Sequence, residues 1–504
     1  MTSSLLNRYA DQVAGTLGCW DRILITGTLP GLCFADGMTG YLSAHNIRIF
    51  DYPRWAEPLR DAIRHNAEQL AQRHGVSIEF VRKHDVRKEE RIQQVLAERG
   101  DAPGLVHILS AMEACTSYKP WHDKQTHHTF LKPDSGKCLH YYFYFIDEEL
   151  GLGYVRVPTW CPFRLQIYFN GHNWLASKLV DAGIDYKLAD NAFVHIADFD
   201  AAQKLADELT VAKLHRALDR FAQRYCPVLR RLGIDGYHWS LMQVEYATDI
   251  VFKRQSDLAP LYESLSRTAI HAVKAEQVAT FLGRKLHGNY QDEIGNDFST
   301  RIEGTRIRHS MGRQSIKMYD KFSLVLRIET TSNDVSFFKH YRKVEHHDGS
   351  TDNKLAPLKK SIYSLADLRE LLAAANRRYL DFLSALDDPS DGERKLRKVS
   401  EPVVEQGRTY KGFNFFLDDD ALAIQALLRG EHFISGLRHA DLQRHLPDRS
   451  PSQVSRLLKR LRVHGLIKKV GKTYKYYLTQ LGLAVSAAGL EIKHMFLVAA
   501  LAAR

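Results

Sequence analysis

Cysteine, proline and long apolar runs are scarce in this sequence. Its 504 residues include 6 cysteines and 15 prolines, and no two cysteines form a CxxC pair. The spacing typical of structural zinc sites and redox motifs is therefore lacking. The best candidate for a membrane span, MFLVAALAA, is too short to cross a bilayer. The opening MTSSLLNRYADQVAGTLG lacks the basic and then apolar pattern of a signal segment. We therefore expect a cytoplasmic protein that does not enter a membrane.

Glycine-rich phosphate loops and an acidic excess are lacking as well. Neither GxxxxGK[ST] nor GxGxxG occurs at a junction between a strand and a helix, so ATP dependence has no support. Lys and Arg number 70 against 59 Asp and Glu, which leaves a net charge of +11. This excess favours a polyanionic partner through non-specific attraction.

The remaining composition is that of a globular chain with several domains. Hydrophobic residues make up 44% and charged residues 26% of the sequence. Strand-like and helix-like segments alternate at first, and later runs of strands are followed by helices, which predicts an α+β fold with mixed or antiparallel sheets. The predicted parts are an N-terminal α/β domain at 1–110, an aromatic-rich α+β region at 111–235 and a central sheet at 236–345, which is the candidate catalytic domain. A helical connector at 361–386 and a winged helix domain at 415–504 are predicted to follow.

Three further segments lie around the central sheet and the connector. The stretch DVSFFKHYRK at 334–343 is predicted to be a helix. Asp, Ser, Gly and Pro cluster at 346–361 and 387–407, which predicts loops or linkers there.

The clearest local pattern is SPSQVSRLLKRLRVHGLIKKVGKTYKYYLTQLG near the C-terminus. Ser450 is suited to cap a helix whose first residue is Pro451. The apolar side chains at 454, 457, 458 and 461 fall on one helical face. The helix is expected to end at Gly465, and two strands around a tight turn follow. Between Pro451 and Tyr477 there are eight Lys or Arg residues and no Asp or Glu, so positive charge is concentrated here.

This segment resembles the winged helix–turn–helix domains of bacterial regulators. The resemblance implies that the helix enters the major groove of double-stranded DNA while lysines of the wing contact phosphates. The alternative is a winged helix that contacts another protein. The residues expected to bind nucleic acid are Ser452, Gln453, Arg456, Lys459, Arg460, Lys468, Lys469, Lys472 and Lys475.

The stretch SIKMYDKFSLVLRIETT in the central region predicts a hairpin with one charged face. Alternation places Lys317, Tyr319 and Lys321 on one face of the first strand. Arg327 and Glu329 share one face of the second strand. A turn near 322–324 makes Lys317 the cross-strand neighbour of Glu329, and Tyr319 the neighbour of Arg327.

Acidic residues upstream of this hairpin suggest a metal site. In QVEYATDIVF, Glu245 and Asp249 point to the same side of a strand. Together with Glu329, and with His309 as a further ligand, they would suit Mg²⁺ or Mn²⁺. The alternative is a set of ordinary ion pairs with Lys317 and Arg327 on an exposed sheet.

The central region resembles the catalytic region of rolling-circle replication initiators from plasmids and filamentous phages. The likeness rests on the acidic strand, a helix from Asp257, a strand that opens with GT at 304–305, KMYDK at 317–321 and LRIE at 326–329. It implies metal-dependent DNA nicking in which a tyrosine attacks a phosphodiester and retains a 5′-phosphate. The residues implied to be catalytic are Tyr319, Lys317, Lys321 and Arg327.

The sequence departs from that family in two respects. It lacks the pair of histidines, separated by one apolar residue, that many such enzymes use for metal. The nucleophile is also open, because Tyr341 and Tyr379 are expected on helices beside basic residues. The whole chain also resembles a widespread set of bacterial proteins, which implies no function.

Other residues offer weaker alternatives. Asp21, in WDRILITGTLPG, would form a ribonuclease H-like carboxylate triad with Glu245 and Glu329, although a salt-bridged strand end is the commoner role. The histidines around WHDKQTHH match no zinc motif, and we expect no zinc there. The aromatic strands HYYFYF and RLQIYFNGHNW could stack bases of single-stranded nucleic acid, but such residues are more often core.

These patterns together favour a metal-dependent DNA nicking or strand-transfer enzyme of the mobile-element or replication-initiator type. Its partners would be double-stranded DNA and also single-stranded DNA. Two alternatives stay open: a non-enzymatic winged-helix regulator whose large N-terminal part senses a ligand or dimerises, and an RNA-binding or RNA-processing protein. A homodimer is compatible with each of the three.

Overall fold

The computed structural model describes residues 4–82, 87–286, 290–301, 304–387, 389–471 and 473–502. The chain divides into two compact units, an N-terminal unit of Met1–Ala385 and a C-terminal unit of Leu386–Arg504. A large mixed sheet with packed helices confirms the predicted α+β class. Among the helices in these ranges, none is both long enough and apolar enough to cross a membrane.

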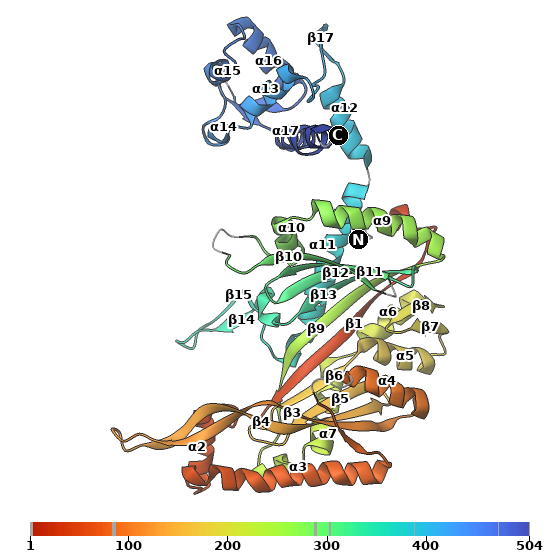
Figure 1. Ribbon diagram of the computed structural model, residues 1–504, viewed down its shortest axis with the longest axis vertical. Helices are drawn as coiled ribbons and strands as arrows, with labels where there is room; N and C mark the ends of the chain where they lie inside the picture. The colour runs from red at the N-terminus through yellow and green to blue at the C-terminus, as the bar shows by residue number, and fades with distance from the viewer. Residues whose placement is uncertain are drawn as a thin grey trace. The chain divides into compact units, whose positions relative to one another are not determined.

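The N-terminal unit is built on a single sheet of 11 strands. β1 and β9 are long antiparallel neighbours in its middle, and Figure 1 shows them running side by side through the unit. The pair β2 and β3 is parallel, and the other neighbouring strands are antiparallel. In spatial order the strands are β10 (Ile294–Arg301), β11 (Gly304–Met311), β12 (Gln314–Lys321), β13 (Val325–Ser332), β9 (His238–Phe252), β1 (Val13–Thr28), β6 (Leu165–Phe169), β5 (Gly151–Pro158), β4 (Thr129–Asp147), β3 (Gly104–His122) and β2 (Ile78–Phe80).

Helices cover both faces of this sheet. Two small hairpins accompany them, β7 (Tyr186–Ala189) with β8 (Ala192–Ile196), and β14 (Lys339–Glu345) with β15 (Thr351–Pro357). The helices of the unit are α1 (Ser4–Arg8), α2 (Ala35–Ala44), α3 (Tyr52–His74), α4 (Lys88–Arg99), α5 (Gly171–Asp181), α6 (Phe199–Asp207), α7 (Val211–Tyr225), α8 (Leu229–Leu232), α9 (Gln255–Ala272), α10 (Ala275–Phe281) and α11 (Leu365–Asp387).

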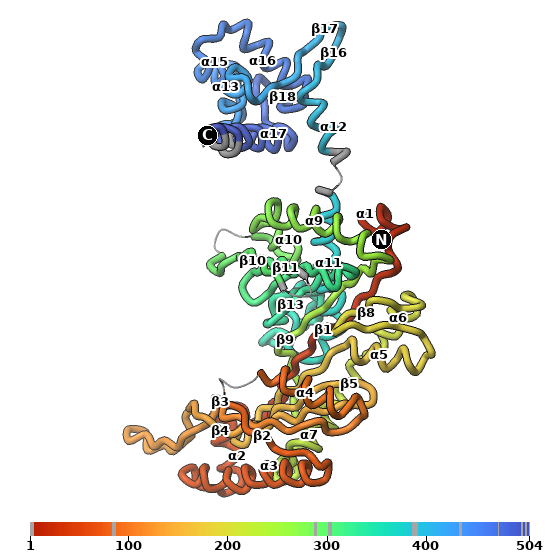
Figure 2. The backbone as a smooth tube through the Cα atoms, turned by 45° about the vertical axis from the view of Figure 1, so that its right-hand side comes forward, coloured from red at the N-terminus to blue at the C-terminus, as the bar shows by residue number. Residues whose placement is uncertain are grey.

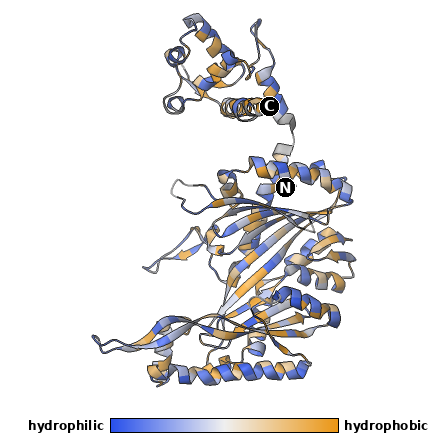
Figure 3. Ribbon diagram, viewed as in Figure 1, coloured by the Kyte–Doolittle hydropathy of each residue, from blue (hydrophilic) through white to orange (hydrophobic). Residues whose placement is uncertain are grey.

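The helix α3 shows how local sequence sets the packing. Its buried residues, among them Leu59, Ile63 and Leu70, recur at helical spacing and pack on Ile108 and Phe143 of the sheet. Figure 2 shows α3 beside β3 and β4. In Figure 3, much of the visible face of α3 is hydrophilic. Gly75 ends the helix with φ of 63°, a left-handed conformation that glycine adopts without strain.

Near the centre of the sheet, one face packs in the main core, and the other carries both a second apolar cluster and the polar side chains of the cavity. Ile316, Met318 and Ile328 join the main core with Leu261 of α9 and Leu372 of α11. On the other face of β1, residues such as Leu17 and Cys19 pack on α5, α6 and the β7–β8 hairpin. The polar side chains discussed below lie on this second face.

Several predicted boundaries are corrected. The divisions expected at 110 and 235 fall inside one compact unit, because strands from all three segments join the same sheet. The helix predicted at 334–343 is wrong, since a short 3-10 turn at Val335–Phe337 leads into strand β14. The loop predicted at 346–361 contains strand β15. The linker predicted at 387–407 contains helix α12 (Pro389–Ser400) and strand β16 (Val403–Glu405).

The C-terminal unit contains the helix and the two following strands expected between Ser450 and Leu478. Ser450 caps the first turn of α16 and Pro451 is its first residue, as expected. Val454, Leu457, Leu458 and Leu461 are buried in a separate core. The unit contains, besides α12 and β16, the elements β17 (Arg408–Tyr410), α13 (Asp418–Leu427), α14 (Gly430–Ser435), α15 (His439–His445), α16 (Pro451–Val463), β18 (Ile467–Lys469), β19 (Tyr476–Leu478), α17 (Gln480–Glu491) and α18 (Ala499–Ala502).

Candidate functional site

The hairpin of β12 and β13 has the predicted register. Lys317 lies opposite Glu329, and Tyr319 lies opposite Arg327. The turn occupies 322–324, where Phe322 has a positive φ. Alternation alone was sufficient to predict this arrangement, because the apolar face of each strand is unambiguous.

A β-bulge places the consecutive residues Asp21 and Arg22 on this same face of the sheet. Trp20 pairs with Tyr246 and Arg22 pairs with Glu245, so Asp21 is the extra residue between two regular pairs. A bulge redirects the side chains around it. Trp20 remains in the main core, whereas both Asp21 and Arg22 line a polar cavity.

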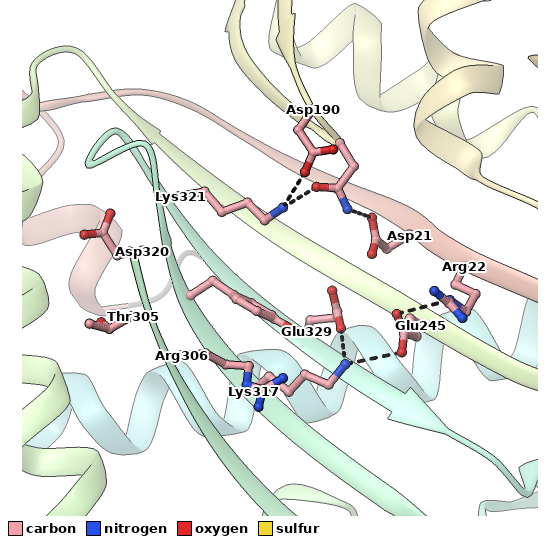
Figure 4. A pocket seen from close by; sticks show the side chains of 12 residues that line it. Asp21, Arg22, Asp190, Glu245, Thr305, Arg306, Lys317, Asp320, Lys321 and Glu329 are labelled. Atoms are coloured by element: carbon pink, nitrogen blue, oxygen red, sulfur yellow. Dashed lines mark hydrogen bonds and ion pairs between the residues drawn. The ribbon is translucent and has the colours of Figure 1, made fainter. Parts of the chain in front are cut away.

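Three carboxylates converge in this cavity, which has a volume of 330 Å³. Asp21, Glu245 and Glu329 come from β1, β9 and β13, and one carboxylate oxygen of each lies within 4.8 Å of the other two. Figure 4 shows these three among the side chains that line the cavity. This acidic cluster (Asp21, Glu245 and Glu329) could hold a metal ion.

Lys317 lies between two members of the acidic cluster (Figure 4). Its Nζ donates to Oε1 of Glu329 at 2.7 Å and to Oε1 of Glu245 at 3.2 Å. Burial would lower the pKa of Lys317, but the two glutamates together raise it above its usual value. Burial raises the pKa of Glu329 to about 7, and the nearby Asp21 and Glu245 act in the same direction against Lys317.

Other cations and a tyrosine line the same cavity. Arg22 Nε lies 3.8 Å from Oε2 of Glu245, and Lys321 Nζ lies 3.5 Å from Oδ2 of Asp190 in the β7–β8 turn. Lys321 also donates to the side-chain oxygen of Asn191. Tyr319 is half-buried in the cavity wall, and burial raises the pKa of its hydroxyl, as does Glu329. Arg306 completes the basic part of the lining.

The structure does not bring Asp249 into the acidic cluster. Its two carboxylate oxygens accept from Arg327 Nε at 2.6 Å and from Nη2 at 2.7 Å. Burial disfavours the charged carboxylate, yet the Arg327 guanidinium holds the pKa of Asp249 well below its ordinary value. The prediction that Asp249 is a metal ligand is therefore corrected: it neutralises a buried arginine.

The structure also corrects the prediction that Arg327 is a catalytic residue. Its side chain is fully buried. It also donates through Nη1 to Asp21 at 3.2 Å, and through Nη2 to the backbone oxygen of Asn191 at 2.7 Å. Nη2 lies 3.1 Å from Nε2 of His172, at the start of α5. Arg327 therefore positions Asp21 and the β7–β8 turn and is not itself among the residues that line the cavity.

His309 lies on the opposite face of the sheet from the acidic cluster. It shares its face of β11 with Ile307 and Met311, which belong to the main core. Its ring nitrogens bond Asn296 at 2.7 Å and the Tyr379 hydroxyl at 2.9 Å. Burial lowers the pKa of His309 to about 4. The prediction that His309 is a metal ligand is wrong, because its side chain lies on the face opposite the acidic cluster and both of its ring nitrogens are already paired.

The alternative tyrosines lie away from the cavity. Tyr341 is on strand β14 and not on a helix, and it is 76% exposed. Tyr379 is on helix α11, as predicted, but it is fully buried and bonds His309. Of the three tyrosines considered, Tyr319 alone lines the cavity with the acidic cluster.

A row of aromatic residues continues from the cavity across the sheet. The guanidinium of Arg22 lies 5.6 Å from the ring centroid of Tyr168 on β6. Tyr168 in turn stacks on Tyr154 of β5, with the ring centroids 5.3 Å apart. Both tyrosines are partly exposed, and Tyr154 also packs against Tyr142 and Tyr144 of the cluster under α4. This row is compatible with base stacking.

The residues predicted to bind nucleic acid in the C-terminal unit fall into different environments. Ser452, Arg456, Lys468 and Lys469 are exposed, and Lys475 is partly exposed. The side-chain oxygen of Gln453 accepts from the Ser450 backbone at 2.6 Å, as part of the helix cap. Lys459 pairs with Glu405 of β16. Lys472 lies outside the described residues.

Arg460 has a structural role that the sequence did not indicate. Its Nη1 and Nη2 bond the carboxylate of Asp420 at 2.7 and 2.9 Å, and its guanidinium lies 3.8 Å from the Phe413 ring centroid. The side chain is 12% exposed. We therefore remove Arg460 from the residues expected to contact DNA.

Comparison of the chain with protein-family models, with curated proteins and with solved structures gave no match.

Proposed function

We propose that this protein is a metal-dependent enzyme that nicks DNA or transfers a DNA strand. The observation that carries the proposal is the acidic cluster in a cavity whose other lining residues include Arg22, Lys317, Lys321 and Arg306. Carboxylates suit a hard divalent cation such as Mg²⁺ or Mn²⁺. Cationic side chains around it suit the charge of a phosphodiester.

The metal would supply polarisation of the phosphate and stabilisation of its developing charge. Lys317 balances two of the three carboxylates at short range. Asp21, Glu245 and Glu329 would hold the ion, whose charge would compensate the carboxylates in place of Lys317. The ammonium of Lys317 would then be able to contact a phosphate oxygen at the same cavity.

Tyr319 is the proposed nucleophile. Its hydroxyl oxygen would form a bond to phosphorus as the P–O3′ bond breaks, which leaves a 5′-phosphotyrosine and a free 3′-hydroxyl. Burial raises the pKa of the Tyr319 hydroxyl, so a proton acceptor is required at neutral pH. The tyrosyl proton would pass to an acceptor at the cavity as the O–P bond forms, and the departing 3′ oxygen would take up a proton as the P–O3′ bond breaks.

The C-terminal unit is proposed to hold double-stranded DNA. Arg456, Lys468 and Lys469 are exposed on α16 and on the wing. Such residues contribute salt-dependent contacts to phosphates. The Arg22, Tyr168 and Tyr154 row supports single-stranded DNA as a second ligand beside the cavity. All six cysteines are free, which suits the expected cytoplasmic location.

A non-enzymatic winged-helix regulator is the second candidate, and one observation favours it. Lys317 already neutralises Glu329 and Glu245 in a mostly buried setting, as structural ion pairs do. In that case the protein binds DNA and leaves it intact.

The test is incubation of the full-length protein with supercoiled plasmid, single-stranded DNA and RNA, with Mg²⁺ or Mn²⁺ and without either. Nicked DNA bound covalently to protein supports the proposal. Y319F and E329Q should abolish it, whereas Y341F and the exposed control E276Q should not. DNA binding without cleavage would favour the regulator, and cleavage of RNA alone would favour an RNA-processing enzyme.

A further inference from the structure

A second cluster of metal-ligating side chains lies within the C-terminal unit. Glu431 and His432 are in the first turn of α14, and His445 is the last residue of α15. One ligand atom of each lies within 4.8 Å of the other two. Oε1 of Glu431 is 2.9 Å from Nε2 of His445 and 3.8 Å from Nε2 of His432.

His432 supplies an independent indication of a ligand. Its side chain is 4% exposed, and its Nε2 is buried without a hydrogen-bond partner in the described structure. The Glu431 oxygen at 3.8 Å is too far for a hydrogen bond. Buried ring nitrogens are normally hydrogen-bonded. An unpaired Nε2 close to a carboxylate and a second imidazole therefore indicates that a ligand, such as a metal ion, binds there.

The spacing suits tetrahedral coordination. Ligand atoms about 2.1 Å from a zinc ion are roughly 3.4 Å from one another in a tetrahedron. The distances of 2.9 and 3.8 Å lie on either side of that value, so small side-chain adjustments would be sufficient. Two imidazoles and one carboxylate are a donor set that borderline ions such as Zn²⁺ accept, with one position left for water.

We propose that Glu431, His432 and His445 form a binding site for Zn²⁺ or a similar borderline divalent cation in the C-terminal unit. The site is separate in residues and in chemistry from the acidic cluster, whose all-oxygen ligands suit harder ions. Arg429 Nε lies 3.2 Å from Oε1 of Glu431, and this contact must loosen when the metal is bound.

A bound ion would connect α14 to α15, which packs against α16. His445 also lines a groove of 1330 Å³ together with Gln453 and Arg456 of α16. A metal ion at the proposed site would therefore fix α14 and α15, and α15 supports α16.

Titration of metal-stripped, full-length protein with Co²⁺ tests this inference, because nitrogen-ligated tetrahedral Co²⁺ absorbs strongly in the visible region. We expect visible bands that Zn²⁺ abolishes by competition. E431Q and H445A should lose these bands, with Zn²⁺ affinity reduced at least about tenfold. H494A, at an exposed histidine in the same unit, should retain them.

E329Q separates this inference from the proposed enzyme, since it should retain the Co²⁺ bands while losing any Mg²⁺ or Mn²⁺ activity. Glu431 is exposed, so E431Q is not expected to impair folding, which far-ultraviolet circular dichroism checks. Bands that are absent in the wild-type protein, or that persist unchanged in both E431Q and H445A, would overturn the site.

Discussion

Lys317 donates to Glu329 at 2.7 Å across the β12–β13 hairpin, and both side chains are almost completely buried. Removing one partner of a buried pair leaves an uncompensated charge. Lys317 therefore contributes to the stability of the folded protein by supplying the positive charge that a divalent ion at the acidic cluster would otherwise supply.

Replacement of Lys317 by Met should lower the free energy of unfolding by about 3–5 kcal/mol at pH 8, because two carboxylates lose their cation. Mn²⁺ should restore part of this loss by binding only the folded protein. Urea unfolding with and without Mn²⁺ measures both effects. K354M removes an exposed ion pair with Asp352 and should change the stability by less than about 1 kcal/mol. A K317M variant as stable as K354M would contradict this expectation.

The raised pKa of Glu329, about 7, predicts a pH dependence of stability. The folded protein retains this proton up to about pH 7, while the unfolded chain releases it near pH 4.3. Stability should therefore fall as pH rises between these values, by at most about 1.4 kcal/mol per pH unit for this one group. E329Q should lack this contribution, so the difference in stability between wild type and E329Q is the quantity to measure. A difference that is flat with pH would show that Glu329 is ionised throughout.

Asp249 should be required for folding stability, and its loss should not act through metal. D249N leaves the buried Arg327 guanidinium without its main counter-charge, and we expect a loss of about 3–5 kcal/mol. The loss should be the same with and without Mn²⁺. The control is D297N, since Asp297 is 57% exposed beside Arg306 and its pair should contribute about 1 kcal/mol or less. Rescue of D249N by Mn²⁺ would instead return Asp249 to the metal site.

Two arginines of α16 should have opposite phenotypes. R456A should weaken binding to a DNA duplex and reduce the salt dependence of log K by about one charge, without affecting unfolding. R460A breaks the buried pair with Asp420 and should instead destabilise the C-terminal unit. Fluorescence anisotropy at several salt concentrations, together with thermal unfolding, separates the two. If R460A remains fully folded and weakens DNA binding as much as R456A does, the assignment of Arg460 to a structural role is contradicted.

The sequence was sufficient for the elements whose signals are local. Alternation fixed the register that pairs Lys317 with Glu329, and the cap at Ser450 with Pro451 located α16. His309 also had an available signal, because Ile307 and Met311 on either side share its parity and mark that face as core. The apolar neighbours were the better guide to the direction of its side chain.

Other parts of the site depended on contacts that alternation does not encode. A bulge between Trp20 and Arg22 lets Arg22 line the cavity beside Asp21, whereas a regular strand would direct these two side chains to opposite faces. Alternation places Asp249 on the same face of β9 as Glu245, but its pairing with Arg327 follows from β9 and β13 being neighbours in the sheet. The partner of Arg460 lies 40 residues away on α13.

Asp21, Glu245 and Glu329 are proposed to bind one divalent ion together. Titration of the full-length protein with Mn²⁺, followed by electron paramagnetic resonance of the free ion, measures this binding. One Mn²⁺ should bind at this cluster in the wild-type protein and in E276Q, and this binding should be lost in D21N, E245Q and E329Q. Mn²⁺ binding that is unchanged in all three cluster variants, or that is absent from the wild-type protein, would contradict this proposal.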